Sequence, residues 1–324
     1  PALETSLSNH EVSQGYKDIT DISVTARFVL KDDPATAFLA WTTTPWTLPG
    51  NAALAVHLDL TYATVEVTTE SEEGKSSEKV ILAKDLVEKV LEGKEFSIVE
   101  EKKGSDLVGV EYVPPFDSYL NQDDLEGKEN AWKVYAADFV TAEDGTGIVH
   151  IAPAFGADDF ALGKENDLPF LQHVKINGEI TKTVPQLAGR QAKPAETDEN
   201  PNNHQSTDIE VIKILAHAGM LFAKKKYTHS YPHCWRTGVP LLNFAMKSWY
   251  IAVEKIKDRM VEENNKVTWV PESIGSERFG NWLESARDWG ISRSRYWGSP
   301  IPVWKSDDGE DVEVIGSIDE LRSK

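Results

Sequence analysis

Two segments contain the residues whose types and spacing could do chemistry. In the first, residues 41–51, three successive threonines, Thr42, Thr43 and Thr44, follow an apolar run. In the second, residues 145–160, a histidine and a pair of aspartates follow another apolar run. Hydroxyls, an imidazole and carboxylates, with glycines that let a ligand approach the backbone, favour a site for a small, polar, charged substrate.

The second segment supplies His150, Asp158 and Asp159. The two aspartates begin a predicted helix over residues 158–166, whose positive N-terminal end would favour ionised carboxylates. Each residue also has a structural interpretation: the aspartates could cap the helix, and the histidine could be a hydrogen-bonded packing residue. From the residues alone, both interpretations stay open.

The elements that must position these segments are mostly short strands. Alternating, β-branched patterns predict strands at 22–30, 36–41, 61–67, 79–83, 132–139 and 148–151, with a turn at 31–34 and an exposed hairpin tip at 68–77. Helices are predicted at 85–92, 158–166, 208–218, 248–263 and 275–287, and a surface loop at 191–207. In a strand, Thr42 and Thr44 would face one way and Thr43 the other.

Short strands with irregular spacing and flanking helices predict an α+β, mostly β fold. The expected form is a distorted, closed or half-closed β-barrel with peripheral helices. The pattern changes near residue 220, where helix becomes more frequent, so a mixed segment is expected to follow the barrel. A chain of 324 residues can hold one large or two modest domains.

The charge balance limits the partners of the chain. Its formal net charge is −19 at pH 7, which argues against broad electrostatic capture of nucleic acid. Binding of a nucleic acid would therefore depend on local basic patches. Two such patches exist, and each could equally be a solvated face: residues 224–226, and Arg287 with Arg293 and Arg295.

Composition also predicts a compartment. No apolar run approaches the roughly 18 residues of a membrane span, and no signal peptide is visible, so no membrane association is expected. A single cysteine fits a reducing compartment, which predicts a cytoplasmic protein. The absence of a first methionine suggests a fragment or a processed chain, and the expected oligomeric state is a monomer.

Three stretches resemble the editing domain of isoleucyl-tRNA synthetases, which are class I aminoacyl-tRNA synthetases. Trp41-Thr42-Thr43-Thr44-Pro45-Trp46-Thr47 resembles the threonine-rich strand of that domain, and residues 145–160 resemble its His-to-Asp loop. Residues 281–298 resemble the return of the chain into the catalytic core. The resemblance runs from about Leu3 to the C-terminus. Valine and leucine relatives typically carry Thr-Thr-Arg-Pro in the first stretch.

The resemblance implies three parts: a linker from the catalytic core over residues 1–20, an editing β-barrel over 21–222, and an exit segment with the edge of the catalytic core over 223–324. The implied activity is post-transfer editing, the hydrolysis of the ester in Val-tRNA(Ile). The chain has no Gly-x-Ser-x-Gly motif, and its cysteine, Cys234, is far from both segments. We therefore expect attack by a positioned water, assisted by the ribose hydroxyl of the substrate.

The resemblance also assigns roles to the residues of both segments. Asp159 would hold the α-ammonium of the mischarged amino acid through a charge-assisted hydrogen bond. Thr42, Thr43 and Thr44 would hold the aminoacyl ester and the terminal ribose. His150 would lie against the substrate side chain and help to exclude the larger isoleucine.

Further residues are predicted to contact the substrate: Trp46, Ala152, Phe155 and Asp158. Trp46 could pack near the terminal adenosine or beneath the loop, and both possibilities stay open. The residues predicted to contact tRNA are Lys224, Lys225 and Lys226.

Neither a metal nor a cofactor is expected for editing. His229, His233 and Cys234 lie close in the sequence, but some relatives have Cys-x-x-Cys beginning at the position of Cys234, and this chain has Thr237 instead. The motifs His-x-Gly-His and Lys-Met-Ser-Lys-Ser, which carry ATP activation in this class, are also missing. ATP is therefore expected for the parent isoleucine–tRNA ligase and not for this chain.

The expected partners are the 3′ end of tRNA(Ile) carrying valine and the rest of isoleucyl-tRNA synthetase. Two alternatives stay open: a non-catalytic insert that positions the tRNA 3′ end, and hydrolysis of Val-AMP in the same pocket. Turnover of the tRNA ester would rule out a non-catalytic insert. Comparing the hydrolysis of Val-tRNA(Ile) with that of Val-AMP would show which of these is the substrate.

Overall fold

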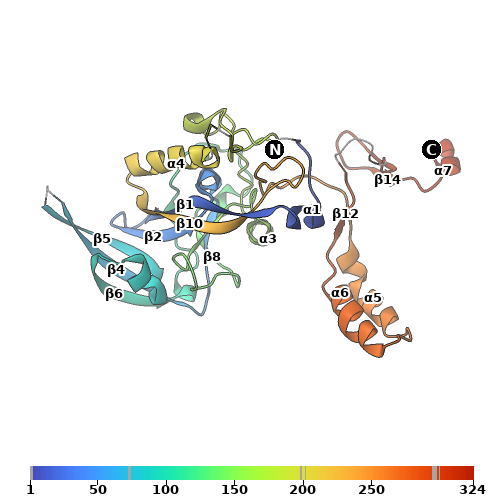
Figure 1. The fold of residues 1–324 in the computed structure, drawn as a ribbon, viewed down its shortest axis with the longest axis horizontal. Coiled ribbons are helices and arrows are strands. Elements are labelled where there is room, and N and C mark those ends of the chain that lie inside the picture. Colours follow the sequence, from blue (N-terminus) through green and yellow to red (C-terminus); the bar gives the residue numbers. More distant parts are fainter. Residues whose placement is uncertain (1–2, 72–73, 198, 201, 294–297, 299) are drawn as a thin grey trace. The chain divides into compact units, whose positions relative to one another are not determined.

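The computed structural model describes residues 3–71, 74–197, 199–200, 202–293, 298 and 300–324 (Figure 1). The chain divides into two compact units, Pro1–Ala245 and Met246–Lys324. Residues 294–297 lie outside the described residues. They include Arg295 of the predicted basic patch and belong to the 281–298 stretch.

The first unit is built on a large mixed sheet, ten-stranded over the described part of the chain. Its strands are β1 (Tyr16–Leu30), β2 (Thr36–Thr42), β3 (Ala53–Val56), β4 (Thr61–Ser71), β5 (Gly74–Ala83), β6 (Glu95–Lys103), β7 (Tyr112–Val113), β8 (Val134–Ala136), β9 (Val149–Ile151) and β10 (Leu221–Pro232). The main path is β6-β4-β5-β2-β9-β3-β8, and β1 pairs with β2, β7 and β10.

The sheet branches at β2. One edge of β2 pairs antiparallel with β1. The other edge pairs in parallel with β5 at its start and with β9 at its end, where Trp41 is opposite Val149. The end of β2 is therefore fixed beside the strand that carries His150, so the two segments singled out in the sequence are neighbours in space.

The strand pairing confirms a mixed fold dominated by a sheet. It does not establish the predicted barrel, because the pairing describes a large sheet that branches at β1 and at β2. An isolated antiparallel bridge between Glu111 and Lys133 joins the residues that precede β7 and β8. Closure into a barrel stays a prediction.

Helices and single turns lie around this sheet. The helices are α1 (Asn9–Ser13), α2 (Val87–Val90), α3 (Ala157–Glu165) and α4 (Ser206–His217). The 3-10 turns are η1 (Pro45–Gly50), η2 (Lys84–Leu86), η3 (Gly104–Asp106), η4 (Lys128–Asn130), η5 (Pro185–Leu187) and η6 (Asn203–Gln205). The amphipathic helix predicted at 208–218 is confirmed as α4, which buries Val211, Ile212 and Leu215. It contacts η1, β1 and β10 (Figure 1).

The core lies between β1, β2 and the elements packed on them. Phe28 and Phe38 are directly opposite each other in the β1–β2 pair, and both are completely buried. Trp46 and Leu54 belong to the same cluster. A second cluster, which includes Leu39, packs side chains of β2, β4 and β5 against α2.

Most predicted elements are confirmed, with some differences in length. The strands predicted at 22–30, 36–41, 61–67 and 79–83 lie within β1, β2, β4 and β5. The predicted exposed tip at 68–77 is wrong in extent, because Thr68 to Ser71 stay paired with residues 74–77. The sequence analysis missed β3, β6 and β10. The run of lysines in β10 shows no apolar alternation, because Lys224, Lys225 and Lys226 are exposed on both faces of the strand.

The boundaries of the first unit differ from the predicted domain limits. The pairing of β1 with β10 runs from Tyr16 opposite Pro232 to Ala26 opposite Leu221. Residues 16–20 and 223–232, which the sequence analysis placed outside the barrel, are therefore part of the same sheet. The first unit extends to Ala245.

The second unit contains short elements. They are β11 (Tyr250–Ile251), η7 (Val253–Ile256), α5 (Lys257–Asn264), the π turn η8 (Ile274–Phe279), α6 (Gly280–Glu284), β12 (Trp289–Gly290), β13 (Val303–Lys305), β14 (Val312–Val314) and α7 (Ile318–Ser323). The helix predicted at 248–263 begins later than expected, and the one predicted at 275–287 is a π turn followed by α6.

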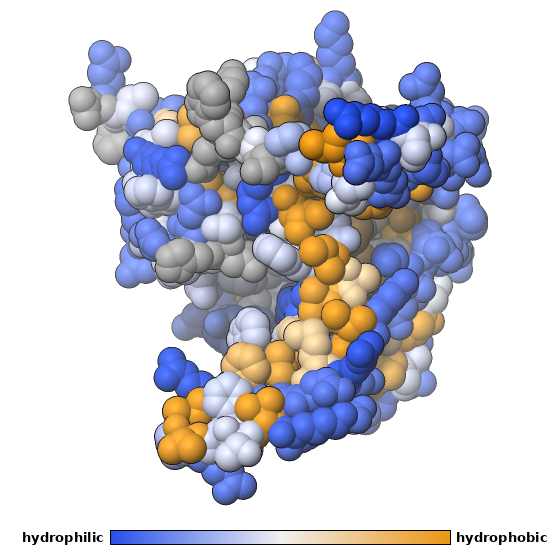
Figure 2. Space-filling view, turned by 90° about the vertical axis from the view of Figure 1, so that its right-hand side faces the viewer, coloured by the Kyte–Doolittle hydropathy of each residue, from blue (hydrophilic) through white to orange (hydrophobic). Residues whose placement is uncertain are grey.

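Several large apolar side chains of the second unit are exposed, including Val270, Trp282 and Trp289. Figure 2 shows that apolar side chains also reach the surface among polar ones on the face of the molecule drawn there. No helix in the described part of the chain is long and apolar enough to cross a membrane.

We expect Phe38→Ala to lower the free energy of unfolding by about 3–5 kcal/mol, because it empties a completely buried position opposite Phe28. Phe139→Ala is the matched control, since Phe139 is 41% exposed and should change stability by less than about 0.5 kcal/mol. Urea denaturation followed by circular dichroism measures both. Equal losses in the two variants would contradict this description of the core.

Candidate functional site

The threonine segment lies where β2 ends. Thr42 is the last residue of the strand, and Thr43 and Thr44 follow outside it. The backbone N–H of Thr44 donates to the hydroxyl of Thr42 at 3.1 Å, and the two hydroxyl oxygens are 3.3 Å apart. The three threonines do not all lie in a strand, as the prediction assumed, because the chain turns after Thr42, but Thr42 and Thr44 do lie on the same side as predicted. The turn brings the side chains of Thr42 and Thr44 together.

The turn η1 begins directly after the threonines. Pro45 occupies its first position, where the missing N–H costs no hydrogen bond. The hydroxyl of Thr47 donates back to the carbonyl of Thr44 at 2.8 Å. All six residues of η1 are buried, so this segment is a rigid support for the threonines.

His150 lies in β9 and is nearly completely buried. Its Nδ1 is 2.9 Å from the amide nitrogen of Asn51, which can only donate, so Nδ1 accepts. Its Nε2 is 3.1 Å from the Thr47 hydroxyl and carries the proton in this arrangement. Burial lowers the pKa of His150 to about 3, and the ring is neutral at physiological pH. Its predicted contact with substrate stays a prediction.

Asp159 is the half-buried carboxylate of the site. It lies in the first turn of α3, and its Oδ1 accepts from the backbone N–H of Ala152 at 3.4 Å. Its side chain folds back over Gly156, where a Cβ atom would lie only 1.6 Å from Oδ2. Asp158 is exposed.

Burial raises the pKa of Asp159 to about 6, and the charge of Asp158 acts in the same direction. The hydrogen bond from Ala152 opposes this shift without cancelling it. A carboxylate that is costly to ionise gains free energy when a cation binds beside it. Asp159 is therefore suited to hold an ammonium group.

Three predicted contact residues form part of the core. Trp46, Ala152 and Phe155 are 2%, 4% and 6% exposed. The rings of Trp46 and Phe155 meet edge to face at 5.1 Å, and Phe155 meets His173 in the same way at 4.9 Å. Of the two roles left open for Trp46, the structure supports packing beneath the loop.

His173 holds the backbone of η1. Its Nε2 donates to the carbonyl of Trp46 at 2.9 Å, so Nδ1 is the unprotonated nitrogen. Nδ1 is buried without a hydrogen-bond partner among the described residues, and it lies beside Gly50. Burial lowers the pKa of His173 to about 4, which keeps the ring neutral.

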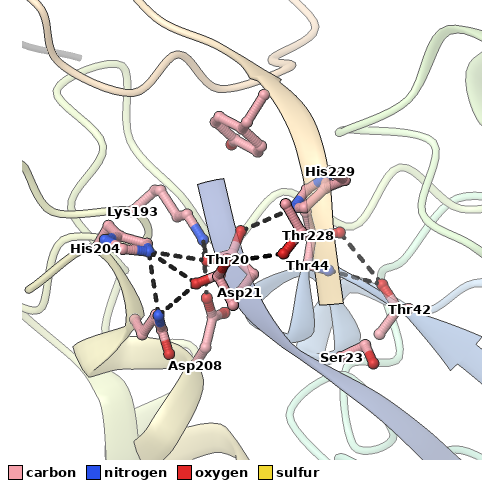
Figure 3. Close-up of polar contacts among 12 residues, drawn as sticks. Thr20, Asp21, Ser23, Thr42, Thr44, Lys193, His204, Asp208, Thr228 and His229 are labelled. Carbon is pink, nitrogen blue, oxygen red and sulfur yellow. Dashed lines mark hydrogen bonds and ion pairs between the residues drawn. The ribbon is translucent and has the colours of Figure 1, made fainter. Parts of the chain in front are cut away.

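A group of ionisable residues, most of them buried and missed as a group by the sequence analysis, lies near the threonine segment (Figure 3). We call it the buried charge cluster; its members are Asp21, Lys193, His204, Asp208 and His229. The ammonium of Lys193 is 2.7 Å from Asp21 Oδ1 and 3.2 Å from Asp208 Oδ2, and none of these three side chains is exposed. Both Nε2 atoms of the histidines face Asp21, at 3.3 and 3.0 Å.

The charges of this cluster support each other. Burial alone would raise the pKa of Asp21, but hydrogen bonds from His204 and His229 and the ammonium of Lys193 outweigh it and hold the pKa well below its usual range. Burial raises the pKa of Asp208 to about 6, against the attraction of Lys193. The hydrogen bond to Asp21 raises the pKa of His204.

The predicted tRNA-contacting lysines lie on β10 and are exposed. Lys224 is opposite Val24 of β1, whose other neighbour is Thr42 of β2. Two strand spacings separate Lys224 from Thr42, about 10 Å, and residues directly opposite each other share a face of the sheet. The fold thus brings the lysines close to the threonine segment.

The residues considered for a metal have other contacts. His229 bonds to Asp21, and His233 Nδ1 is 2.9 Å from the carbonyl of Tyr231. Within the described ranges, no group of three or more His, Cys, Asp or Glu side chains could hold a metal ion. The expectation that editing needs no metal stays a prediction.

The comparison with known families decides the relationship. Residues 1–324 match the model of the class I tRNA synthetases (I, L, M and V). The chain belongs to this family. The prediction of a class I aminoacyl-tRNA synthetase, made from the threonine and His-to-Asp segments, is thereby confirmed.

The similar class I synthetases include isoleucine–tRNA ligases. The chain is 46% identical to that of Chlamydia pneumoniae over 321 residues, 99% of this chain and 28% of the relative. It is 43% identical to that of Clostridium novyi over 324 residues, again 28% of the relative. The chain thus spans little more than a quarter of the length of these relatives.

Solved editing domains of leucyl-tRNA synthetases show a partial likeness to this synthetase chain. The cytosolic enzyme's domain from P. knowlesi has 14% identity and a TM-score of 0.34, and the match covers 48% of this chain and 66% of that one. The corresponding domain from P. falciparum has 16% identity and a TM-score of 0.30, with 39% and 44% covered.

The raised pKa of Asp159 predicts a pH-dependent stability difference. The native carboxyl binds its proton more tightly than the unfolded one, about 6 against 3.8, so the wild-type synthetase fragment loses stability as pH rises through this window. The Asp159→Asn variant has no carboxyl group at this position, so it does not lose stability in this way as pH rises. Its advantage over wild type should grow by on the order of 2 kcal/mol between pH 4 and pH 7.

Urea denaturation at both pH values measures this difference. Asp138→Asn, which removes an exposed carboxylate, is the control and should show no such growth. A constant difference between wild type and Asp159→Asn at the two pH values would argue against a raised pKa.

Proposed function

We propose that the first unit is the editing site of an isoleucine-specific class I tRNA synthetase and that it hydrolyses the aminoacyl ester of Val-tRNA(Ile). The observation that carries the proposal is the pairing of Trp41 with Val149. This pairing sets the threonine segment beside the strand that leads to Ala152, whose N–H contacts Asp159. The hydroxyls thus come from the end of β2, and the carboxylate comes from α3, which follows the neighbouring strand β9.

In this proposal Asp159 binds the α-ammonium of the misattached valine. The contact is a charge-assisted hydrogen bond in a partly desolvated place, where it is stronger than in water. A bound ammonium also lowers the cost of ionising a carboxylate whose pKa is about 6 in the free protein. Recognition of a free α-amine would distinguish an aminoacyl ester from a peptidyl one.

The threonine segment would hold the ester and the terminal ribose. The hydroxyls of Thr42 and Thr44 lie 3.3 Å apart on a turn that η1 supports. A water attacks the ester carbonyl, and the neighbouring ribose hydroxyl of the substrate assists. Positioning of the water and stabilisation of the developing oxyanion supply the acceleration without a covalent enzyme intermediate.

The need for such a site follows from the limits of side-chain discrimination. A pocket that binds isoleucine cannot strongly reject valine, because one methylene changes affinity only modestly; isoleucyl-tRNA synthetases are the standard example. A second, smaller site removes what the first accepts by mistake. The bonds of His150 to Thr47 and Asn51 fix its ring, and steric exclusion of isoleucine requires a fixed wall.

The lysines on β10 would contact the backbone of the tRNA 3′ end. The chain is strongly acidic overall, so binding of the tRNA depends on local charge and on the rest of the synthetase. Lys224, which shares a sheet face with Thr42, is well placed to meet a phosphate of the terminal nucleotides. We place the protein in the cytoplasm with the other components of translation.

Asp159→Ala should lower the rate of Val-tRNA(Ile) deacylation by about 10²-fold, because it removes the partner of the α-ammonium. Asp158→Ala is the matched control on the same helical turn, where the side chain is exposed, and should leave the rate nearly unchanged. Both are measured in this chain and in the full-length synthetase, with Ile-tRNA(Ile) and Val-AMP as comparison substrates.

Full activity of Asp159→Ala would refute the assignment of this residue. Hydrolysis of Val-AMP but not of Val-tRNA(Ile) would mean that the adenylate, and not the tRNA ester, is the substrate. Unchanged hydrolysis in the full-length synthetase after Asp159→Ala, together with no turnover by this chain, would favour an insert that only positions the tRNA 3′ end.

The pH profile of kcat/KM should rise from pH 5 and level off above about pH 6–7. The carboxylate form of Asp159 is the one that binds an ammonium, and the fraction in this form increases as pH passes its pKa of about 6. In Asp159→Asn the residual activity should lack this rise. A profile that falls over the same range in the wild type would contradict the proposed role of the carboxylate.

A further inference from the structure

The buried charge cluster makes a direct contact with the threonine segment. Asp208, on the first turn of α4, uses Oδ2 to bind Lys193 and Oδ1 to accept from the backbone N–H of Trp46 at 3.1 Å. Trp46 lies only two residues after Thr44. This bond joins positions that are 162 residues apart in the chain.

We propose that Asp208 is a positioning residue for the editing site. It would cap the start of η1 through Trp46 N–H and thereby fix where the hydroxyls of Thr42 and Thr44 lie. The proposal rests on the function proposed above, and it adds a residue outside the two segments that the sequence singled out.

The start of η1 lacks the usual side-chain cap from its own N-cap residue. The first N–H groups of a helical turn have no partner within the turn, and a threonine at the N-cap normally accepts from one of them. Thr44 occupies the N-cap of η1 but makes no such bond. Its hydroxyl lies beside Thr42 instead. Asp208 satisfies the N–H of Trp46 in its place, which leaves the Thr44 hydroxyl available to a substrate.

The backbone of Trp46 is held on both sides by side chains. Its N–H donates to Asp208 from one side, and its carbonyl accepts from His173 Nε2 at 2.9 Å on the other. Its side chain is almost completely buried. The backbone that follows the threonines is therefore fixed by two side chains from different parts of the fold.

Asp208 is itself held firmly in place. Its second oxygen is tied to Lys193, which is tied to Asp21, and all three side chains have no exposed surface (Figure 3). An apolar group of the same size would often be equally stabilising at such a position. An ionic network does what an apolar group does not: it directs an acceptor oxygen at one chosen N–H.

A matched pair of substitutions tests the proposal. Asp208→Asn and Asp208→Leu both remove the charge and keep the number and branching of the side-chain non-hydrogen atoms of aspartate, but only asparagine keeps an oxygen for Trp46 N–H. Two quantities are compared well below the unfolding midpoint: hydrogen exchange of the Trp46 amide, followed by NMR, and kcat for deacylation of Val-tRNA(Ile). Thermal unfolding of each variant records the general loss of stability.

We expect Asp208→Leu to lose protection of the Trp46 amide and to lower kcat about tenfold, with a smaller effect on KM. Asp208→Asn should keep the protection and lose less than about threefold in kcat. Equal kcat values in the two variants would overturn the proposal, as would a Trp46 amide that stays protected in Asp208→Leu.

If loss of one of the two carboxylates that contact Lys193 prevents folding, the same comparison uses Lys193→Met combined with each of the two substitutions. These double variants leave no uncompensated lysine in the interior, and His204 and His229 still pair with Asp21. Hydrogen exchange of the Trp46 amide tests the capping role of Asp208 independently of the proposed editing function. A full-length wild-type synthetase that does not hydrolyse Val-tRNA(Ile) refutes the editing function, whereas the pattern of Trp46 protection in this chain still decides whether Asp208 caps η1.

Discussion

The pairing of β1 along both of its edges is the constraint on which the rest of the first unit depends. Val24 has Thr42 on one side and Lys224 on the other, so a single strand sets the threonines beside the exposed lysines. Three positions earlier, Asp21 turns into the interior, where it meets Lys193. The register of β1 therefore determines both how the threonines lie relative to the lysines and where Asp21 enters the buried charge cluster.

The ion pairs of the chain divide into two kinds. Pairs such as Lys84 with Glu101 are exposed on both sides, and pairs of this kind contribute about 0–1 kcal/mol. The pair of Lys193 with Asp21 has no exposed surface, so each charge would be very costly without the other. Such an arrangement tolerates little movement. It suits a support that must hold η1, and with it the threonine segment, in one position.

Much of the fold and of the candidate site could be predicted from the sequence, because the signals are local. The strands that hold Phe28 and Phe38 follow from β-branched alternation, and α4 follows from its amphipathic period. The buried charge cluster could not be predicted in this way. Lys193 is 172 residues from Asp21 in the sequence, and the loop that carries it was expected at the surface because its composition is polar.

The sequence by itself determined which residues are candidates for the chemistry and which family the chain resembles, since a residue type and its spacing are properties of the chain. The tertiary structure alone decided how these residues are used. It ended β2 at Thr42, enclosed Trp46 in the core, and placed Asp208 where it accepts from the Trp46 N–H. The physical reason is that burial, and with it the cost of an unpaired polar group, exists only after distant segments have come together.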